Sequence, residues 1–87
     1  MRLKISFEFV EMDNEIIAVP IGEDADKIRG VIKLNPSGKE ILELLKDETS
    51  EEKVVDSLSQ KYENNRDSLA EYVREMIEKM NHLGVLI

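Results

Sequence analysis

The sequence has 87 residues, no cysteine, and 19 acidic against 12 basic side chains, which give a net charge of −7. This length is enough for one small domain, residues 1–87, with a modest hydrophobic core. The absence of cysteine excludes disulfides and thiolate metal sites, and the absence of an apolar run of about 18 residues excludes a membrane-spanning helix.

A β-hairpin is expected first. Every second residue from Leu3 to Phe9 is apolar, which predicts a half-buried strand with its aromatic side chains inward. Asp13-Asn14 is a turn signal, and Ile16–Ile21 has the composition of a second strand that pairs with the first. Pro20 predicts that this second strand lies at an edge of the sheet or ends there.

A loop over residues 22–29 leads to a third strand at Val31–Leu34, which runs directly into a helix. Asn35 is a strong N-cap residue because its side-chain oxygen can accept a hydrogen bond from the first helical turn. Pro36 suits the first helical position, where its missing N–H costs nothing. The helix is expected to run to about Lys46, so this junction determines how the sheet meets the helices.

Two further helices are expected. Thr49-Ser50-Glu51-Glu52 has the pattern of a capping box with Thr49 as the N-cap, and the helix continues to about Lys61. The third helix spans about residues 66–83, and Gly84 is a natural residue to end it. Three strands followed by three helices predict an α+β domain whose helices pack on one face of an antiparallel sheet.

No pattern indicates catalysis or metal binding. His82, the lone histidine, lies near the end of the third helix, where it complements the negative helix terminus. No second histidine or pair of carboxylates has metal-ligand spacing, and the four glycines are too scattered for a phosphate-binding loop. Ser37 has no evident activating base. We therefore expect neither enzymatic activity nor a cofactor.

The third helix has a wide apolar stripe. The residues that suffice to pack it on the domain are Val73, Met76, Ile77, Met80 and Leu83. Leu69 and Tyr72 extend the stripe towards the start of the helix, and either they belong to the core or they line a groove for a partner. Apolar grooves beside a sheet edge are places where extended peptides add a strand.

Several motifs resemble the PqqD family. Leu34-Asn35-Pro36-Ser37-Gly38, within the segment 30–38, resembles its Leu-Asn-x-Thr/Ser-Gly signature, with Pro36 and Ser37 in place of the commoner Glu and Thr. The helix after it ends in an aliphatic pair, Leu44-Leu45, as in the family. Further segments that resemble family motifs are residues 19–23, 49–55, 58–62 and 76–86.

The resemblance implies a RiPP recognition element, a domain resembling a winged helix-turn-helix. Such domains bind the leader segment of the precursor of a ribosomally synthesised and post-translationally modified peptide (a RiPP). They present this leader to a modifying enzyme, which in PqqD and many relatives is a radical S-adenosylmethionine (radical SAM) maturase. In the family, the leader adds as a strand to the third strand and lies beside the third helix.

The same resemblance implies site residues in this chain. The backbone that would pair with the leader belongs to Val31, Ile32, Lys33 and Leu34. The side chains that would line the groove are Leu69, Tyr72, Val73 and Met76. Lys33, Arg66 and Arg74 are candidates to meet acidic leader residues. Because strand side chains alternate, either Ile32 and Leu34 or their neighbours face the core.

Two other functions compete with leader binding. A winged-helix DNA-binding domain has the same helix order, but the acidic side chains of the third helix outnumber its basic ones and would be repelled by phosphate, so we expect no nucleic acid partner. An adaptor domain would bind a folded partner instead of an extended peptide. A strand edge can also pair with a second copy, which makes a homodimer possible.

The start of the chain has an alternating pattern and lacks the apolar block of a signal peptide. With no membrane span in the pattern either, we expect a cytoplasmic protein.

Overall fold

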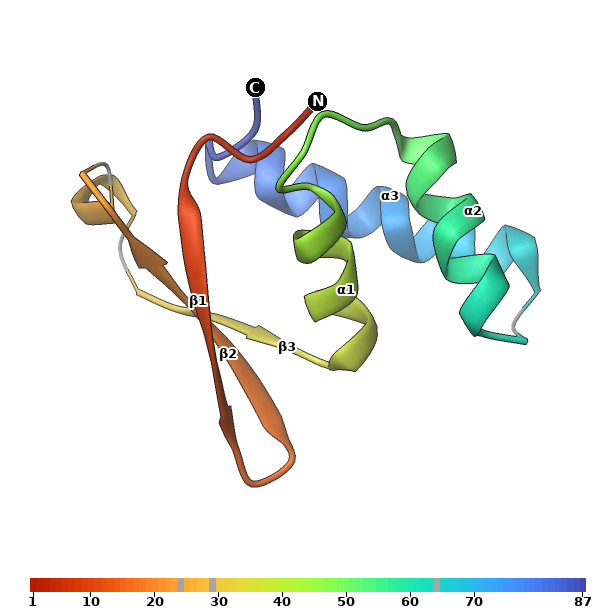
Figure 1. Ribbon diagram of the computed structural model, residues 1–87, viewed down its shortest axis with the longest axis horizontal. Coiled ribbons are helices and arrows are strands. Elements are labelled where there is room, and N and C mark those ends of the chain that lie inside the picture. Colours follow the sequence, from red (N-terminus) through yellow and green to blue (C-terminus); the bar gives the residue numbers. More distant parts are fainter. Residues whose placement is uncertain (24, 29, 64) are drawn as a thin grey trace.

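A three-stranded antiparallel sheet is followed by three helices in the computed structural model, which describes residues 1–23, 25–28, 30–63 and 65–87. The strands lie in the order β1 (Ser6–Met12), β2 (Glu15–Ile21) and β3 (Ile32–Leu34). The helices are α1 (Pro36–Leu44), α2 (Glu51–Lys61) and α3 (Arg66–His82). All three lie on one side of the sheet (Figure 1), so the predicted α+β class is confirmed.

The predicted loop between β2 and β3 contains a 3₁₀ helix, η1 (Ala25–Lys27). Asp24 and Arg29 of that loop lie outside the described residues, as does Asn64 before α3. The predicted turn at Asp13-Asn14 is confirmed, and Asp13 adopts a positive φ of 56° there. A short polar side chain tolerates this left-handed conformation better than most.

The prediction that Pro20 marks an edge strand is wrong, because β2 is the central strand. β3 is short and pairs only with Ile16–Ala18 of β2, so Pro20 lies beyond the segment that is paired on both sides. The prediction that the strand ends near Pro20 is confirmed, since β2 ends at Ile21. The position of a proline along a strand therefore mattered more than the position of that strand in the sheet.

The N-cap predicted from the sequence is confirmed for α1 but is wrong for α2. The Asn35 side chain accepts a hydrogen bond from the Gly38 N–H, with Pro36 at the first helical position. In α2, the N-cap is Ser50, whose Oγ accepts from the Lys53 N–H at 3.2 Å. The prediction of Thr49 is wrong because its N–H instead donates to the Met1 carbonyl at 2.9 Å, which holds Thr49 before the helix.

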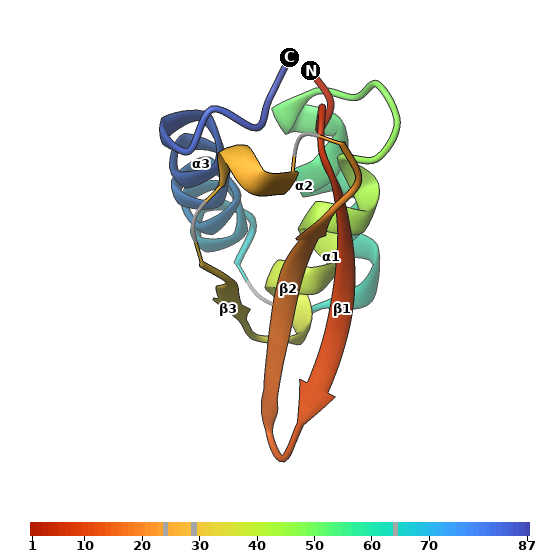
Figure 2. The same ribbon diagram turned by 90° about the vertical axis from the view of Figure 1, so that its left-hand side faces the viewer.

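The core lies between the inner face of the sheet and the helices. Its fully buried side chains are Ile41, Leu42, Leu45, Val54, Leu58, Val73, Met80 and Val85. The two ends of the chain lie side by side (Figures 1 and 2), because Leu3 and Leu86 form a β-bridge and the Ile87 N–H donates to the Arg2 carbonyl at 2.8 Å. Val85 thereby fills the end of the core.

An exposed ion pair joins α1 to α2. The Lys61 Nζ donates to the Glu40 Oε1 at 2.9 Å. This hydrogen bond, followed by the charge of Glu40, raises the pKa of Lys61. Lys61 is exposed and Glu40 is half-buried, so solvent screens the pair and it adds little to the stability of the fold.

Ser50→Ala should lower the free energy of unfolding by about 1 kcal/mol, because the Lys53 N–H loses the acceptor that caps α2. Thr49→Ala, the matched control, should have a clearly smaller effect. Urea unfolding followed by circular dichroism measures both variants. Equal losses for the two would contradict the assignment of Ser50 as the N-cap.

Candidate functional site

The candidate site begins at the free edge of β3. β3 pairs with β2 on one side, and within the described ranges no strand pairs with its other side. A free edge presents backbone N–H and C=O groups to which another strand can be added. In Figure 2 this edge lies below α3 and faces away from the hairpin.

A groove lies between β3 and α3 and encloses about 180 Å³. We call it the β3–α3 groove; its lining residues are Ile28, Gly30, Val31, Ile32, Lys33, Lys79 and Leu83. Val31 is 53% exposed and Leu83 is 40% exposed, so apolar surface is available on both walls. Lys33 and Lys79 add an ammonium group to each wall, which suits a peptide with both apolar and acidic side chains.

Successive side chains of β3 alternate between the core face and the opposite face of the sheet. Ile32 and Leu34 are buried on the core face, whereas Lys33 is exposed on the opposite face. Val31 precedes Lys33 by two residues and is exposed as well. Their side chains are therefore available to a neighbouring strand, while Ile32 and Leu34 contribute backbone to the edge and packing to the core.

The predicted groove residues of α3 are more deeply buried than a binding surface requires. Val73 has no exposed surface, and Leu69 and Met76 are 6% and 8% exposed. Tyr72 is half-buried and, with Leu69, lines a second hollow of about 210 Å³ beside Asn35. Of the four residues, Tyr72 is the one that combines accessible surface with a position beside β3.

The predicted site residues do not include Ile28, Lys79 and Leu83, which line the groove. Lys79 lies seven residues after Tyr72, and Leu83 lies four further on, so the three share one side of α3. This spacing was a usable signal for the helix wall of the groove. No comparable signal was available for Ile28, which precedes β3 in an irregular segment.

Arg66 and Arg74 are not brought to the β3–α3 groove. Arg66 forms an ion pair with Asp56, and the Arg74 Nε lies 3.3 Å from Glu51 Oε1. Both acidic partners belong to α2, so the two exposed arginine side chains reach towards α2. Of the three predicted cations, Lys33 is the one that lines the groove.

Asn35 connects β3, α1 and α3. Its Oδ1 accepts hydrogen bonds from the Ser37 Oγ at 3.0 Å, the Gly38 N–H at 2.8 Å and the Tyr72 hydroxyl at 2.7 Å. The first two bonds are local to the helix start, and the third spans 37 residues. The N-cap of α1 is therefore also the polar contact that positions Tyr72 beside the end of β3.

Gly38 allows α3 to approach the start of α1. A Cβ at this position would lie 3.2 Å from Leu34 Cδ2, Met76 Cε and the Tyr72 hydroxyl. These contacts are closer than normal packing distances, so any larger residue would displace β3 or α3 side chains. Asn35 and Gly38 thus have a shared structural role in the Asn-x-Ser-Gly sequence.

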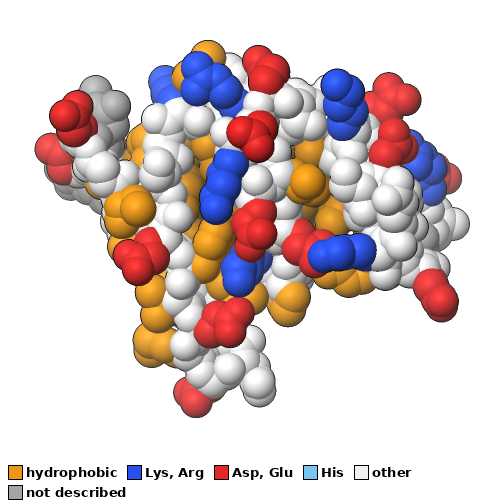
Figure 3. All heavy atoms as spheres, viewed as in Figure 1, with side chains coloured by type: hydrophobic (Ala, Val, Ile, Leu, Met, Phe, Trp, Pro, Cys, Tyr) orange, Lys and Arg blue, Asp and Glu red, His pale blue; other side chains and the backbone are white. Residues whose placement is uncertain are grey.

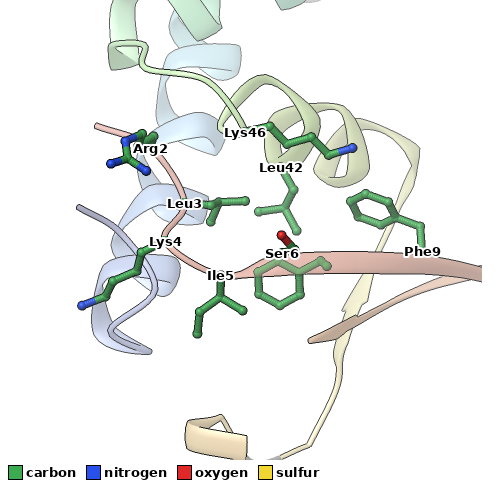
Figure 4. A pocket seen from close by; sticks show the side chains of 9 residues that line it. Arg2, Leu3, Lys4, Ile5, Ser6, Phe9, Leu42 and Lys46 are labelled. Carbon is green, nitrogen blue, oxygen red and sulfur yellow. The ribbon is translucent and has the colours of Figure 1, made fainter. Parts of the chain in front are cut away.

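A larger hollow, of about 490 Å³, lies at the opposite edge of the sheet, where β1 meets α1 (Figure 4). Its lining residues are Arg2, Leu3, Lys4, Ile5, Ser6, Phe7, Phe9, Leu42 and Lys46. The ammonium groups of Lys39 and Lys46 lie 5.6 and 5.9 Å from the centre of the Phe9 ring. Figure 3 shows basic and acidic side chains beside hydrophobic ones on this face. The lining includes no carboxylate or histidine for acid–base chemistry.

Other chemistry has little support in the described part of the chain. Residues 1–23, 25–28, 30–63 and 65–87 include no group of three or more His, Cys, Asp or Glu side chains that could hold a metal ion. His82 is exposed on the last turn of α3. In the same ranges, no helix is both long and apolar enough to cross a membrane.

Comparison with known proteins supports the resemblance seen in the sequence. The family model described as coenzyme PQQ synthesis protein D (PqqD) matches residues 22–86. The chain belongs to the PqqD family. The matched segment contains Asn35, Gly38 and every residue that lines the β3–α3 groove.

A solved structure described as TbiB1 in complex with the TbiA(beta) leader peptide has the same fold as this PqqD-family domain. The TM-score is 0.70 at 17% sequence identity, and the alignment covers 99% of this chain and 94% of that chain. No curated protein sequence matches this chain significantly. The structural likeness extends beyond the family match to include the β1–β2 hairpin.

Asn35→Ala should lower the free energy of unfolding by about 1–2 kcal/mol, because it removes the α1 N-cap and the acceptor of the Tyr72 hydroxyl. Tyr72→Phe, which removes only the second bond, should cost about 0.5–1.5 kcal/mol.

Asn35→Asp is the matched control for Asn35→Ala, since it keeps an oxygen acceptor at the N-cap. It should unfold close to the wild-type urea concentration. A loss for Asn35→Asp as large as that for Asn35→Ala would show that the acceptor is not what stabilises the junction.

Proposed function

We propose that this PqqD-family domain binds the leader segment of a ribosomally synthesised precursor peptide and presents it to a modifying enzyme. The observation that carries the proposal is the free edge of β3 beside the β3–α3 groove. The structure of TbiB1 with a leader peptide supports it, because that protein has the same fold over nearly the whole of both chains.

In the proposed complex, the leader is an added strand on β3. Residues Val31–Leu34 would supply the backbone groups for the ladder. The ladder provides affinity for many sequences, and side-chain pockets select among them. A leader that is disordered when free loses conformational entropy on binding, so the affinity should be moderate. Moderate affinity also suits a domain that must release the peptide after modification.

The side chains of the added strand would meet two different surfaces. Leader residues that point towards α3 would contact Tyr72, Lys79 and Leu83, and those that point away would lie beside Val31 and Lys33. Leu69, Val73 and Met76 would support the groove from the core. We assign Lys33 and Lys79 to acidic leader residues, because Arg66 and Arg74 pair with carboxylates of α2.

The chemistry would belong to the partner enzyme, such as a radical SAM maturase, and this domain would act as the binding component in the cytoplasm. DNA binding is less well supported. The solvent-facing surface of α3 includes Asp67, Glu71, Glu75 and Glu78 around Arg74. This negative surface would repel the phosphates that a recognition helix has to approach.

Titration with synthetic leaders from the short reading frames beside the gene should shift the amide NMR signals of residues 31–34, 72, 79 and 83. An N-methyl scan of a leader that binds tests strand addition directly. In a strand, alternate N–H groups face the neighbouring strand, so N-methylation should abolish binding at every second residue and spare the residues between. If the N-methylated leaders lost or retained binding without this alternation, the result would argue against an added strand.

Lys79→Glu should weaken the binding of an acidic leader by about threefold, the size expected of one exposed charge pair. Lys53→Glu makes the same charge change on the exposed face of α2 and should have little effect. Tyr72→Ala should weaken binding while the domain remains folded. Equal weakening by Lys79→Glu and Lys53→Glu would mean that net charge matters and the groove does not.

A further inference from the structure

One face of the sheet is not covered by helices. β-strand side chains alternate between faces, and the helices lie on the face that contains Ile16, Ala18, Ile32 and Leu34. We call the opposite one the outer face; Figure 2 views the sheet from this side. Its residues are Ser6, Glu8, Val10 and Met12 of β1, Glu15, Ile17, Val19 and Ile21 of β2, and Val31 and Lys33 at β3.

The outer face is unusually apolar for a solvent-facing surface. Of the six large hydrophobic side chains exposed in the described ranges, four lie on it: Val10 at 38%, Met12 at 57%, Ile21 at 42% and Val31 at 53%. Ile17 and Val19 lie between them, are half-buried, and do not pack against the core cluster. Contiguous apolar surface on a small protein marks an interaction site more often than scattered single residues do.

The register shows that these side chains form one patch. Val10 pairs with Ile17, and Ile17 pairs with Lys33, so one row crosses all three strands. Glu8 pairs with Val19 in the next row on the same face. The apolar side chains therefore occupy the centre of the outer face, with the Glu8 carboxylate at its β1 margin, the Lys33 ammonium group at its β3 margin and the Glu15 carboxylate at its hairpin end.

This arrangement of charge is self-complementary. Glu8 and Lys33 lie diagonally across the patch, and neither forms an ion pair with any described residue. A twofold axis that lays β1 of one copy across β3 of the other brings each Lys33 towards the partner's Glu8. The same operation stacks the apolar centres on each other. Isologous contacts of this kind close into a dimer.

We infer that the outer face binds a second copy of this chain, in a sheet-on-sheet dimer centred on Ile17 and Val19. Two sheets packed face to face interdigitate their side chains at a spacing of about 10 Å. The apolar centre supplies the attraction, and the Glu8–Lys33 pairs select the orientation. This inference is independent of leader binding.

The dimer should be weak and should exchange with the monomer. The outer face has ten residues, whereas stable interfaces use about 20–30 residues on each side. Each copy also has a net charge of −7, so the two copies repel each other. Because salt screens this repulsion, added salt should strengthen the dimer, unlike an association held together by ion pairs alone.

Dimerisation on the outer face leaves the backbone edge of β3 open. The contact uses side chains that point away from the helices, whereas strand addition uses backbone groups in the plane of the sheet. Val31 and Lys33 lie at the border of both surfaces. A leader bound to β3 would therefore lie next to the second copy, and the two would share Val31 and Lys33 at this border.

Sedimentation equilibrium from low micromolar to millimolar concentration tests the dimer. The wild type should show a monomer–dimer equilibrium that shifts towards dimer with added salt. Ile17→Lys should raise the dissociation constant by about tenfold or more, because it places an unpaired charge at the centre of the contact. Gln60→Lys, with the same charge change on the exposed face of α2, should not raise it.

A charge exchange tests the orientation. Glu8→Lys should weaken the dimer, because it places two cations opposite each other. The double variant with Lys33→Glu should restore the dimer. Such a restoration would not occur if the two residues acted only in folding. Circular dichroism checks that every variant is folded.

A wild type that stays monomeric at millimolar concentration would overturn the inference, as would equal dimerisation of Ile17→Lys and Gln60→Lys. A monomer whose outer face is instead covered by a modifying enzyme would overturn it too. Leader titration of Ile17→Lys separates the two proposals. If Ile17→Lys loses the dimer and still binds the leader, the two functions belong to different surfaces. If no leader binds the wild type, the dimer result is unaffected.

Discussion

Three hydrogen bonds converge on one oxygen, Asn35 Oδ1, and the candidate site depends on them. Two of the bonds, from Ser37 and Gly38, cap the first turn of α1 directly after β3. The third holds the Tyr72 hydroxyl of α3 against the same oxygen. Without a side chain at Gly38, α3 can pack close to this junction. The distance between the free edge of β3 and α3, and hence the width of the groove, follows from these contacts.

The local half of this arrangement was predictable from the sequence, and the distant half was not. An Asn-Pro pair between an apolar strand and an amphipathic helix predicts the cap, because cap and helix start are neighbours in the chain. The Tyr72 bond joins residues 37 positions apart. The same distinction explains the error at Thr49, where a hydrogen bond to Met1 shifts the N-cap to Ser50. It also explains why Pro20 is found in the central strand, because its environment depends on how far β3 extends along β2.

For the candidate site, the sequence predicted a place between β3 and α3, where the structure has a groove, but it did not predict which side of α3 lines that groove. The 3.6-residue period shows which residues of α3 share a face, and it does not show which neighbour each face meets. Arg66 and Arg74 turned out to face carboxylates of α2, and Lys79 and Leu83 face β3. The packing direction of α3 against α2 decides between them, and this direction is set by core side chains from the whole domain, such as Val54 and Leu58.

The architecture itself explains why this small domain has surfaces left for partners. Three helices on one side of a three-stranded sheet make two layers, and no helix of the described residues covers the other face. Such a sheet must expose two edges and one face. Here a hollow at the β1 edge is lined in part by Arg2, Lys4 and Lys46, β3 has a groove beside its edge, and the outer face is apolar. Because backbone edges and side-chain faces are perpendicular, a peptide strand and a second copy can use the same sheet through different groups, except at Val31 and Lys33, which border both surfaces.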